Sequence, residues 1–248
     1  MSLLTILLLG CFFPLFPVSV VFNQLLRRAT HPALRAALVL LWPQVGVLVM
    51  TRLGQEPPTW VLWWAILTSL LYALRLLAMR DVQHWIGFLA TSQWSMLWLL
   101  FQTAPQHPSL VALGSSVPLA LTVFLAAGLE RRLGAAYTHL YGGLAALMPR
   151  FSLMLTLTVL AAAATPVFPQ FFVVLLLLLN SPLELSFFIL VTALVWSWAG
   201  LRLLQGLLVG AEERARPLSD LRRALACAYA LTLLALAAGG IYLSGGVP

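Results

Sequence analysis

The residues best placed to do chemistry surround two prolines in the middle of a long apolar run. Pro166 and Pro169 interrupt the run Phe151–Leu179, and Gln170 follows directly. A proline has no backbone N–H and clashes with the carbonyl one turn earlier, so the helix breaks and its freed carbonyls need partners in protein or water. Because carriers place ion or substrate sites at such breaks, this stretch is a candidate transport site. A plain proline kink in a structural helix is the alternative.

A small set of polar residues in other apolar runs could continue such a site. The candidates for a polar or ion path are Ser92, Gln93, Ser116, Glu184 and Arg202. An ionisable side chain within a membrane is a functional hypothesis by default. Arg202 is the deepest, but it lies two turns from a charged loop, within snorkelling reach, which favours a structural role. Glu184 is expected near the outer surface, and serine or glutamine in such runs usually supplies interhelical hydrogen bonds.

Other kinds of site are missing from the sequence. It contains no paired carboxylates, no His/Cys cluster, no glycine-rich phosphate loop and no nucleophile beside a base. We therefore expect no enzymatic activity, no cofactor and no metal site in this chain. The histidines fall in or beside loops, so none is expected to be a mid-membrane relay: His31, His84, His107 and His139. The chain also has no lysine.

The elements that must position these residues are transmembrane helices. Of the 248 residues, 62% are hydrophobic and 8% are charged, more apolar than a soluble domain can bury. The formal charge of +7 lies mostly between the apolar runs, so it indicates topology and no nucleic-acid partner. The fold class is therefore an all-α integral membrane protein. Eight crossings are predicted, one of them broken: Leu3–Leu26, Ala33–Met50, Thr59–Ala78, His84–Phe101, Ser109–Leu129, Phe151–Leu179, Leu183–Val209 and Ala224–Leu243.

The arginines predict how these crossings are oriented, because cytoplasmic loops hold most basic residues. With the N-terminus outside, the outer loops hold only Arg52. If Phe151–Leu179 were two crossings, the cluster Arg214–Arg223 would move outside, so one broken helix is favoured. The first run lacks a basic start and a small-residue cleavage site, so we expect a retained helix and no cleaved signal peptide. Both termini are then expected outside, which for a bacterial inner membrane is the periplasm.

Four segments, in order along the chain, resemble one known family. They are RDVQHWIGFLATSQWSM from Arg80, FLAAGLERRLG from Phe124 with the connection YGGLAALMP, TPVFPQFFVVLLLL from Thr165, and GLRLLQGLLVG from Gly200. These segments are similar to the antiporter-like proton-channel subunits of respiratory complex I. Mrp antiporters, membrane-bound hydrogenases and bacterial inorganic-carbon uptake complexes share that family. The resemblance covers roughly Thr59–Val209.

The resemblance implies two inverted five-helix repeats, each with one broken helix, and additional helices at the ends. We interpret residues 57–210 as the second of these repeats, with its broken helix at 151–179. Residues 1–56 then form two N-terminal transmembrane helices, and residues 211–248 form a cytoplasmic loop and the final helix. The two N-terminal helices could correspond to the first two of the family, as if the first repeat had been lost.

The resemblance also implies what this chain lacks. The family moves protons along lysine, histidine and glutamate at mid-membrane depth. The lysine expected after the break falls on Val174, and the histidine and lysine of the preceding helix fall on Ser116 and Ala120. We therefore predict a non-catalytic accessory membrane subunit of a complex I-like or inorganic-carbon uptake complex, docked in the lipid bilayer beside a full-length antiporter-like subunit. The alternatives are a proton- or cation-conducting half-channel, an independent small transporter, or an assembly factor.

Overall fold

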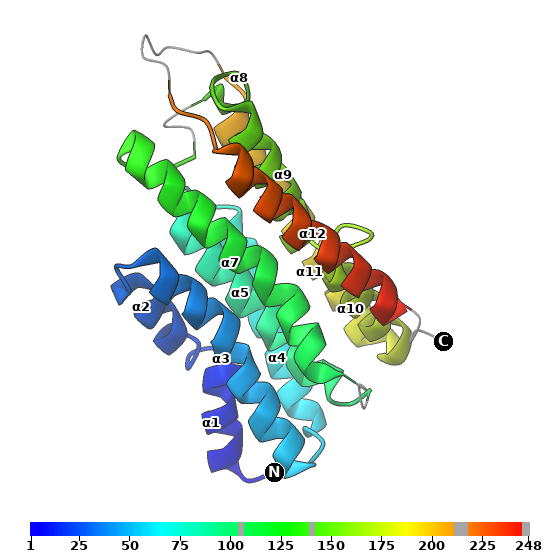
Figure 1. Cartoon of the computed structure of the whole chain (residues 1–248). Coiled ribbons are helices and arrows are strands. Elements are labelled where there is room, and N and C mark those ends of the chain that lie inside the picture. The colour runs from blue at the N-terminus through cyan, green and yellow to red at the C-terminus, as the bar shows by residue number, and fades with distance from the viewer. Residues whose placement is uncertain (104–106, 139–141, 211–217, 245–248) are drawn as a thin grey trace.

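The computed structural model describes residues 1–103, 107–138, 142–210 and 218–244, and over these residues it is helical without named strands (Figure 1). Five helices, α3, α4, α7, α11 and α12, are long and apolar enough to cross a membrane. This confirms the expected all-α membrane class. The helices are α1 Leu3–Phe12, α2 Val20–Arg28, α3 Pro32–Leu53, α4 Thr59–Leu76, α5 Val82–Ser95, α6 Leu97–Leu100, α7 Pro108–Leu133, α8 Leu144–Leu147, α9 Pro149–Ala162, α10 Pro169–Asn180, α11 Leu183–Leu208 and α12 Arg223–Ser244.

Prolines and glycines set many of the helix ends. Proline stands at the start of α3, α7, α9 and α10, where its missing N–H costs no intrahelical hydrogen bond. Gly54 and Gly134 end α3 and α7 with φ of 56° and 83°, the left-handed conformation that glycine adopts without strain. The five long helices match five predicted crossings. The remaining predicted crossings require short helices in series, such as α5 and α6, so eight crossings stays a prediction.

The predicted break in Phe151–Leu179 is confirmed. Helix α9 ends at Ala162 and α10 begins at Pro169. Between them, Ala164 and Val167 have positive φ values of 58° and 84°. A non-glycine residue in this region costs about 1–3 kcal/mol, and the surrounding structure must hold it there. The break is therefore a defined, strained turn.

The prediction of one continuous helix over Leu3–Leu26 is wrong. The run divides into α1 and α2, with turns over residues 13–19 between them. Pro14 and Pro17 are the physical cause, since neither can extend the helix that α1 begins. The sequence here, PLFP, has the same proline spacing as PVFP at Pro166–Pro169. We call the segments 13–19 and 163–168 the first and second breaks.

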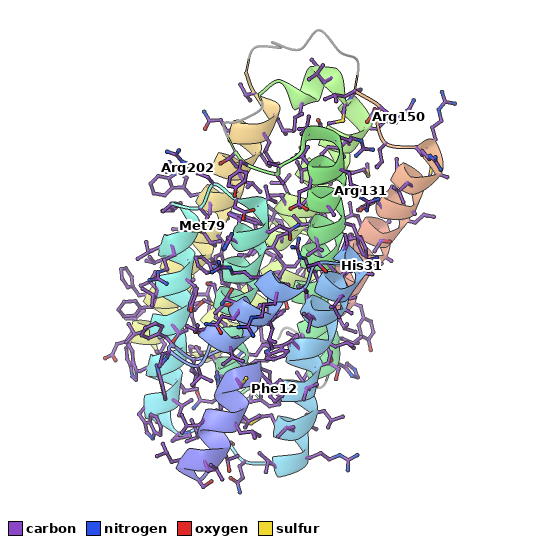
Figure 2. All side chains as sticks on the ribbon, turned by 90° about the vertical axis from the view of Figure 1, so that its left-hand side faces the viewer. Phe12, His31, Met79, Arg131, Arg150 and Arg202 are labelled. Atoms are coloured by element: carbon purple, nitrogen blue, oxygen red, sulfur yellow. The ribbon has the colours of Figure 1, made fainter. Side chains whose placement is uncertain are left out.

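Most arginines gather at one end of the bundle, which we call the arginine-rich end. Figure 2 shows labelled members of this group, Arg131, Arg150 and Arg202, towards one end and Phe12 towards the other. Arg52 lies at the end of α3, on the opposite side. Arg214, Arg216 and His139 lie outside the described residues. The described arginines of this end are Arg27, Arg28, Arg35, Arg75, Arg80, Arg131, Arg132, Arg150, Arg202, Arg222 and Arg223.

Helix α5 lies at the centre of the bundle. Every residue from Leu89 to Leu100 is buried. It packs against α2, α4 and α7. A helix buried on all sides normally carries apolar side chains, so polar groups at this depth need partners. This makes α5 the element that positions the candidate site.

Candidate functional site

The candidate site is built on the polar turn of α5, which we define as residues 91–95. Its polar side chains are each at most 2% exposed: Thr91, Ser92, Gln93 and Ser95. Successive helical residues point about 100° apart, because the helix has ~3.6 residues per turn. The polar turn therefore reaches several neighbouring elements at one level of the bundle. Of these residues, only Ser92 and Gln93 are path candidates predicted from the sequence.

Gln93 joins the polar turn to the second break. Its Nε2 donates to the carbonyl oxygen of Ala162 at 2.6 Å. Ser197 Oγ donates to Ala163 O at 3.2 Å, and Thr165 Oγ1 donates to Leu160 O at 3.0 Å. Carbonyls freed by the break are therefore paired within the protein, as a membrane interior requires. The Oε1 atom of Gln93 is buried without a hydrogen-bond partner in the described part of the chain.

Ser95 joins the polar turn to the first break. Its Oγ donates to Pro14 O at 2.5 Å. Three indole N–H groups donate to other backbone carbonyl oxygens near this break. The Nε1 to O distances are 2.8 Å from Trp42 to Cys11, 2.9 Å from Trp98 to Phe13 and 2.8 Å from Trp64 to Phe16. These tryptophans thus donate hydrogen bonds to carbonyl groups that lose their intrahelical partners where the helix breaks. Composition alone gives no signal for that role, but the repeated P-x-F-P spacing marks the place where donors are needed.

The polar turn also holds α4 and α11. Ser92 Oγ donates to Ser69 O, and Ser69 Oγ donates to Ser92 O, each at 2.7 Å. The indole N–H of Trp196 donates to Ser92 Oγ at 2.8 Å. On another side, Asn23 Nδ2 donates to Thr91 Oγ1 at 2.9 Å. The polar turn is therefore hydrogen-bonded to α2, α4, α11, the first break and the end of α9 just before the second break.

The buried polar groups share one chemical property. Among the described residues, the buried side chains with polar atoms include no carboxylate, imidazole, guanidinium or amine. Tyr72, whose hydroxyl lies 2.8 Å from Ser19 Oγ, is the titratable side chain that joins this set. The other members of the set are hydroxyls, amides and indole N–H groups, which carry no charge. The network can hold water or orient a dipole, but it has no group that exchanges a proton readily.

Charged groups lie instead at a cavity of about 360 Å³ at the arginine-rich end. Arg35 Nη1 lies 3.9 Å from Glu130 Oε2, and His84 Nδ1 contacts Asp81 Oδ2. Both pairs line the cavity, and so do Asn23 and Tyr72. The cavity therefore joins a charged surface to the uncharged network. The sequence alone does not predict this group of charged residues, because each lies at a helix end and they meet only in the fold.

The second break is also clamped by two glycines. A Cβ atom built on Gly114 of α7 would lie 2.5 Å from Pro169 Cβ, and one on Gly240 of α12 would lie 2.3 Å from the carbonyl oxygen of Val167. Both distances are shorter than any normal contact. Helices α7 and α12 therefore approach the break closely from two sides. The sequence predicts α12 only as a final crossing and gives no signal for this contact.

Comparison with known proteins gives matches by structure and none by sequence. No protein-family model and no curated protein matches the chain. A chain of respiratory complex I from Thermus thermophilus with bound NADH matches with a TM-score of 0.80 and 21% identity, over 96% of this chain and 54% of that one. The chain has the fold of an antiporter-like membrane subunit. The resemblance inferred from the four sequence segments is thus confirmed at the level of fold.

Two further structures have this antiporter-like fold. A chain of the membrane-bound sulfane sulfur reductase, an archaeal respiratory membrane complex, matches with a TM-score of 0.79 and 18% identity. The match covers 96% of this chain and 51% of that chain. A chain of the Mrp complex of a Dietzia species matches with a TM-score of 0.73 and 17% identity. The match covers 97% of this chain and 56% of that chain. The chain therefore spans about half the length of the chains it matches.

Within the antiporter-like fold, the other predicted site residues do not join the network. Ser116 is buried but donates to Ala112 O of its own helix at 2.8 Å. Gln170 is buried in the first turn of α10, next to Pro169. Glu184 is exposed in the first turn of α11. Arg202 is exposed and lines a separate cavity of about 340 Å³ at the arginine-rich end, together with Arg80 and Trp85.

Positions expected to carry the family's proton relay can also be located. Val174 is buried in α10, and Ala120 is buried in α7 near Ser116. Pro166 is exposed at the second break, whereas Pro169 is buried. The candidate path named from the sequence thus separates into a connected part, Ser92 and Gln93, and an unconnected remainder.

Proposed function

We propose that this chain is a non-catalytic accessory subunit of an ion-translocating membrane complex, docked beside a full-length antiporter-like subunit. The observation that carries the proposal is the uncharged chemistry of the polar network around Gln93 and Ser95. Proton transfer along a chain of groups requires members whose pKa values lie near the operating pH. Here the titratable pairs stand at a surface cavity, and hydrogen bonds close the centre. Such a centre stabilises a fold better than it relays protons.

The fold supports a place in a larger assembly. The three matching chains described above come from multi-subunit membrane complexes, two of them respiratory. A complex I-like complex and an inorganic-carbon uptake complex both fit, and any redox or hydration chemistry would lie on partner subunits. In this arrangement the chain is a multi-pass protein of a bacterial inner membrane with both termini in the periplasm. Residues 1–56, 57–210 and 211–248 would be its N-terminal helices, repeat and final helix.

One observation favours a second candidate, a conducting half-channel. The cavity of about 360 Å³ leads from charged residues to Asn23 and Tyr72. Asn23 is hydrogen-bonded to Thr91 of the polar turn, so water in the cavity would touch the network. A half-channel of this kind would need a partner chain to supply titratable groups.

Affinity purification of the tagged native chain in mild detergent, followed by mass spectrometry of every stoichiometric partner, tests the proposal. We expect recovery with a full-length antiporter-like subunit in a fixed ratio. Redox proteins in the same fraction would identify a complex I-like assembly, and proteins resembling carbonic anhydrase would identify carbon uptake. Recovery of the chain alone, together with proton flux when it is placed in liposomes, would overturn the accessory-subunit proposal.

A further inference from the structure

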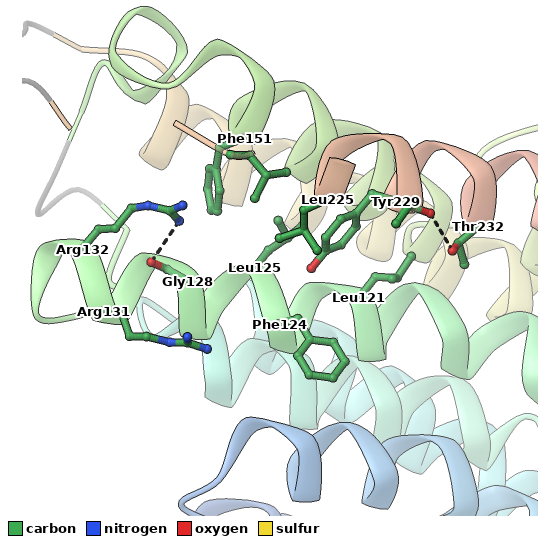
Figure 3. A pocket seen from close by; sticks show the side chains of 12 residues that line it. Leu121, Phe124, Leu125, Gly128, Arg131, Arg132, Phe151, Leu225, Tyr229 and Thr232 are labelled. Carbon is green, nitrogen blue, oxygen red and sulfur yellow. Dashed lines mark hydrogen bonds between the residues drawn. The ribbon is translucent and has the colours of Figure 1, made fainter. Parts of the chain in front are cut away.

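A groove of about 580 Å³ lies between α7 and α12 at the arginine-rich end (Figure 3). Its walls are mainly apolar, with Leu121 and Leu125 on α7, and Leu225 and Tyr229 on α12. Phe151 of α9 also lines it. The volume is within the range of about 300–1,000 Å³ that ligand pockets usually have. This groove is separate from the polar network and from the cavity beside Asp81.

The groove is held open by the way α12 is attached. Asp220, just before α12, accepts hydrogen bonds at 3.0 Å from the backbone N–H groups of Arg150 and Phe151 at the start of α9. Along its length α12 packs mainly on α9 and α10. The start of α12 is therefore fixed to α9, and the flank of α7 facing it stays uncovered. Phe124 and Leu225 are 41% and 48% exposed there, so the groove opens sideways towards lipid.

Two guanidinium groups stand at one end of the groove. Arg132 Nη1 donates to Gly128 O at 3.2 Å, and its guanidinium carbon lies 5.6 Å from the centre of the Phe151 ring. The side chain is thus directed over the wall of the groove. The side chain of Arg131, on the same turn, has no hydrogen bond or ion pair within the described part of the chain, and none of the described residues that line the groove is acidic. The groove combines an apolar body with two positive charges at its mouth.

We propose that this groove binds an anionic phospholipid, with an acyl chain between α7 and α12 and the phosphate beside Arg131 and Arg132. Charge complementarity selects this occupant, because basic pockets between transmembrane helices at a membrane surface bind acidic head groups. A smaller apolar cavity of about 180 Å³ lies between the same two helices further along, lined by Leu113 and Leu236. An acyl chain that follows the helices therefore meets apolar walls beyond the first groove.

Native mass spectrometry of the full chain, released from detergent with equal amounts of phosphatidylglycerol and phosphatidylcholine, tests this site. We expect the wild type to retain phosphatidylglycerol preferentially. The double variant R131Q/R132Q should bind it about 30-fold more weakly, since each arginine near a membrane surface contributes about fivefold. The variant R27Q/R28Q is the matched control, because it removes the same charge from the last turn of α2 at the same end.

Two further variants separate the groove from its charges. A228F places a ring in the groove and should abolish retention while both arginines remain. R131K/R132K keeps the charge and should keep most of the preference, which also reports that the site folds. Equal loss in R27Q/R28Q and R131Q/R132Q would overturn the proposal in favour of bulk charge attraction. Full retention by A228F would overturn it because the lipid would then lie elsewhere.

Discussion

Gln93 Nε2 lies 2.6 Å from the carbonyl oxygen of Ala162, so the central helix α5 is hydrogen-bonded to the last residue before the second break. Two residues along α5, Ser95 makes the corresponding bond to Pro14 in the first break. One turn of one helix therefore fixes both interruptions of the bundle. The two breaks are coupled through a rigid element, and disturbing either should be felt at the other.

The tryptophans offer the cleanest test of how the first break is stabilised. W98F keeps an aromatic ring at this position but removes the indole N–H that donates to Phe13 O at 2.9 Å. W85F is the matched control, because Trp85 is equally buried and its Nε1 has no partner in the described structure. We expect W98F to destabilise the chain by about 1–3 kcal/mol more than W85F, since a buried carbonyl is left unpaired as well. Thermal unfolding in detergent measures this.

The outcome for the control is equally specific. W85F should cost less than W98F, because both lose the same ring volume but W85F removes a buried donor that has no acceptor in the described structure. If W85F and W98F lowered the melting temperature equally, loss of packing would explain both, and the hydrogen bond to Phe13 would have no measurable role.

The close contact between α12 and the second break predicts a sharp difference between two neighbouring glycines. G240A would place a Cβ atom 2.3 Å from the carbonyl oxygen of Val167, whereas the same atom on Gly239 meets nothing within 4 Å. Overpacking of this kind costs about 1–3 kcal/mol, because the obstacle is backbone. In the interior of a helix, Gly→Ala otherwise gains about 1 kcal/mol. We therefore expect G240A to unfold at a lower temperature than wild type and G239A to be unchanged or more stable.

This difference is also a test of the fold at α12. Size-exclusion chromatography of both variants, heated in parallel, gives the comparison directly. Equal stability of G240A and G239A would mean that α12 does not approach the second break as closely as Gly240 and Val167 indicate.

The sequence predicts helix breaks that prolines cause locally, but it does not predict hydrogen bonds between residues that lie far apart along the chain. Pro166 and Pro169 break a helix wherever they stand, so the second break followed from the sequence. Pro14 and Pro17 act in the same way, but the apolar residues around them predict a single crossing, and that prediction is wrong. The network depends on pairs far apart in sequence, such as Gln93 with Ala162 and Ser92 with Trp196, separated by 69 and 104 residues. No local pattern specifies such a pair before the fold is known.

The attachment of α12 predicts a pH effect. Burial tends to raise the pKa of Asp220, but the N–H groups of Leu221, Phe151 and Arg150, with the charge of Arg150, outweigh it and lower the pKa below its ordinary value of 3.8. A carboxylate with a lowered pKa stabilises the fold above its unfolded-state pKa, and the stabilisation is lost as the pH falls through the folded-state value. The contribution of Asp220 should therefore be complete at neutral pH and disappear below pH 3.8.

Melting temperatures of wild type and D220N from pH 7 downwards measure this contribution. D220N should be less stable at neutral pH, because an amide oxygen is a weaker acceptor, and the two curves should converge in acid. E56Q is the control, since Glu56 is exposed in the loop after α3. A difference between D220N and wild type that stayed constant with pH would show that ionisation of Asp220 does not stabilise the start of α12.

The choice between scaffold and half-channel rests on the polar residues at mid-bundle. The triple variant Q93L/S116A/Q170L removes the polar atoms of the path candidates next to the second break and on α7. Loss of the Gln93 hydrogen bond should cost about 0.6–3 kcal/mol, while Ser116 only bonds its own helix and should cost little. An accessory subunit should then still assemble, and the purified complex should keep its activity and ion flux. A half-channel should assemble but lose flux, because Gln93 is the side chain that joins the polar turn to the end of α9 beside the second break. Flux through the reconstituted complex, normalised to the amount of this chain it contains, distinguishes the two: a loss of flux at full assembly would reject the accessory role.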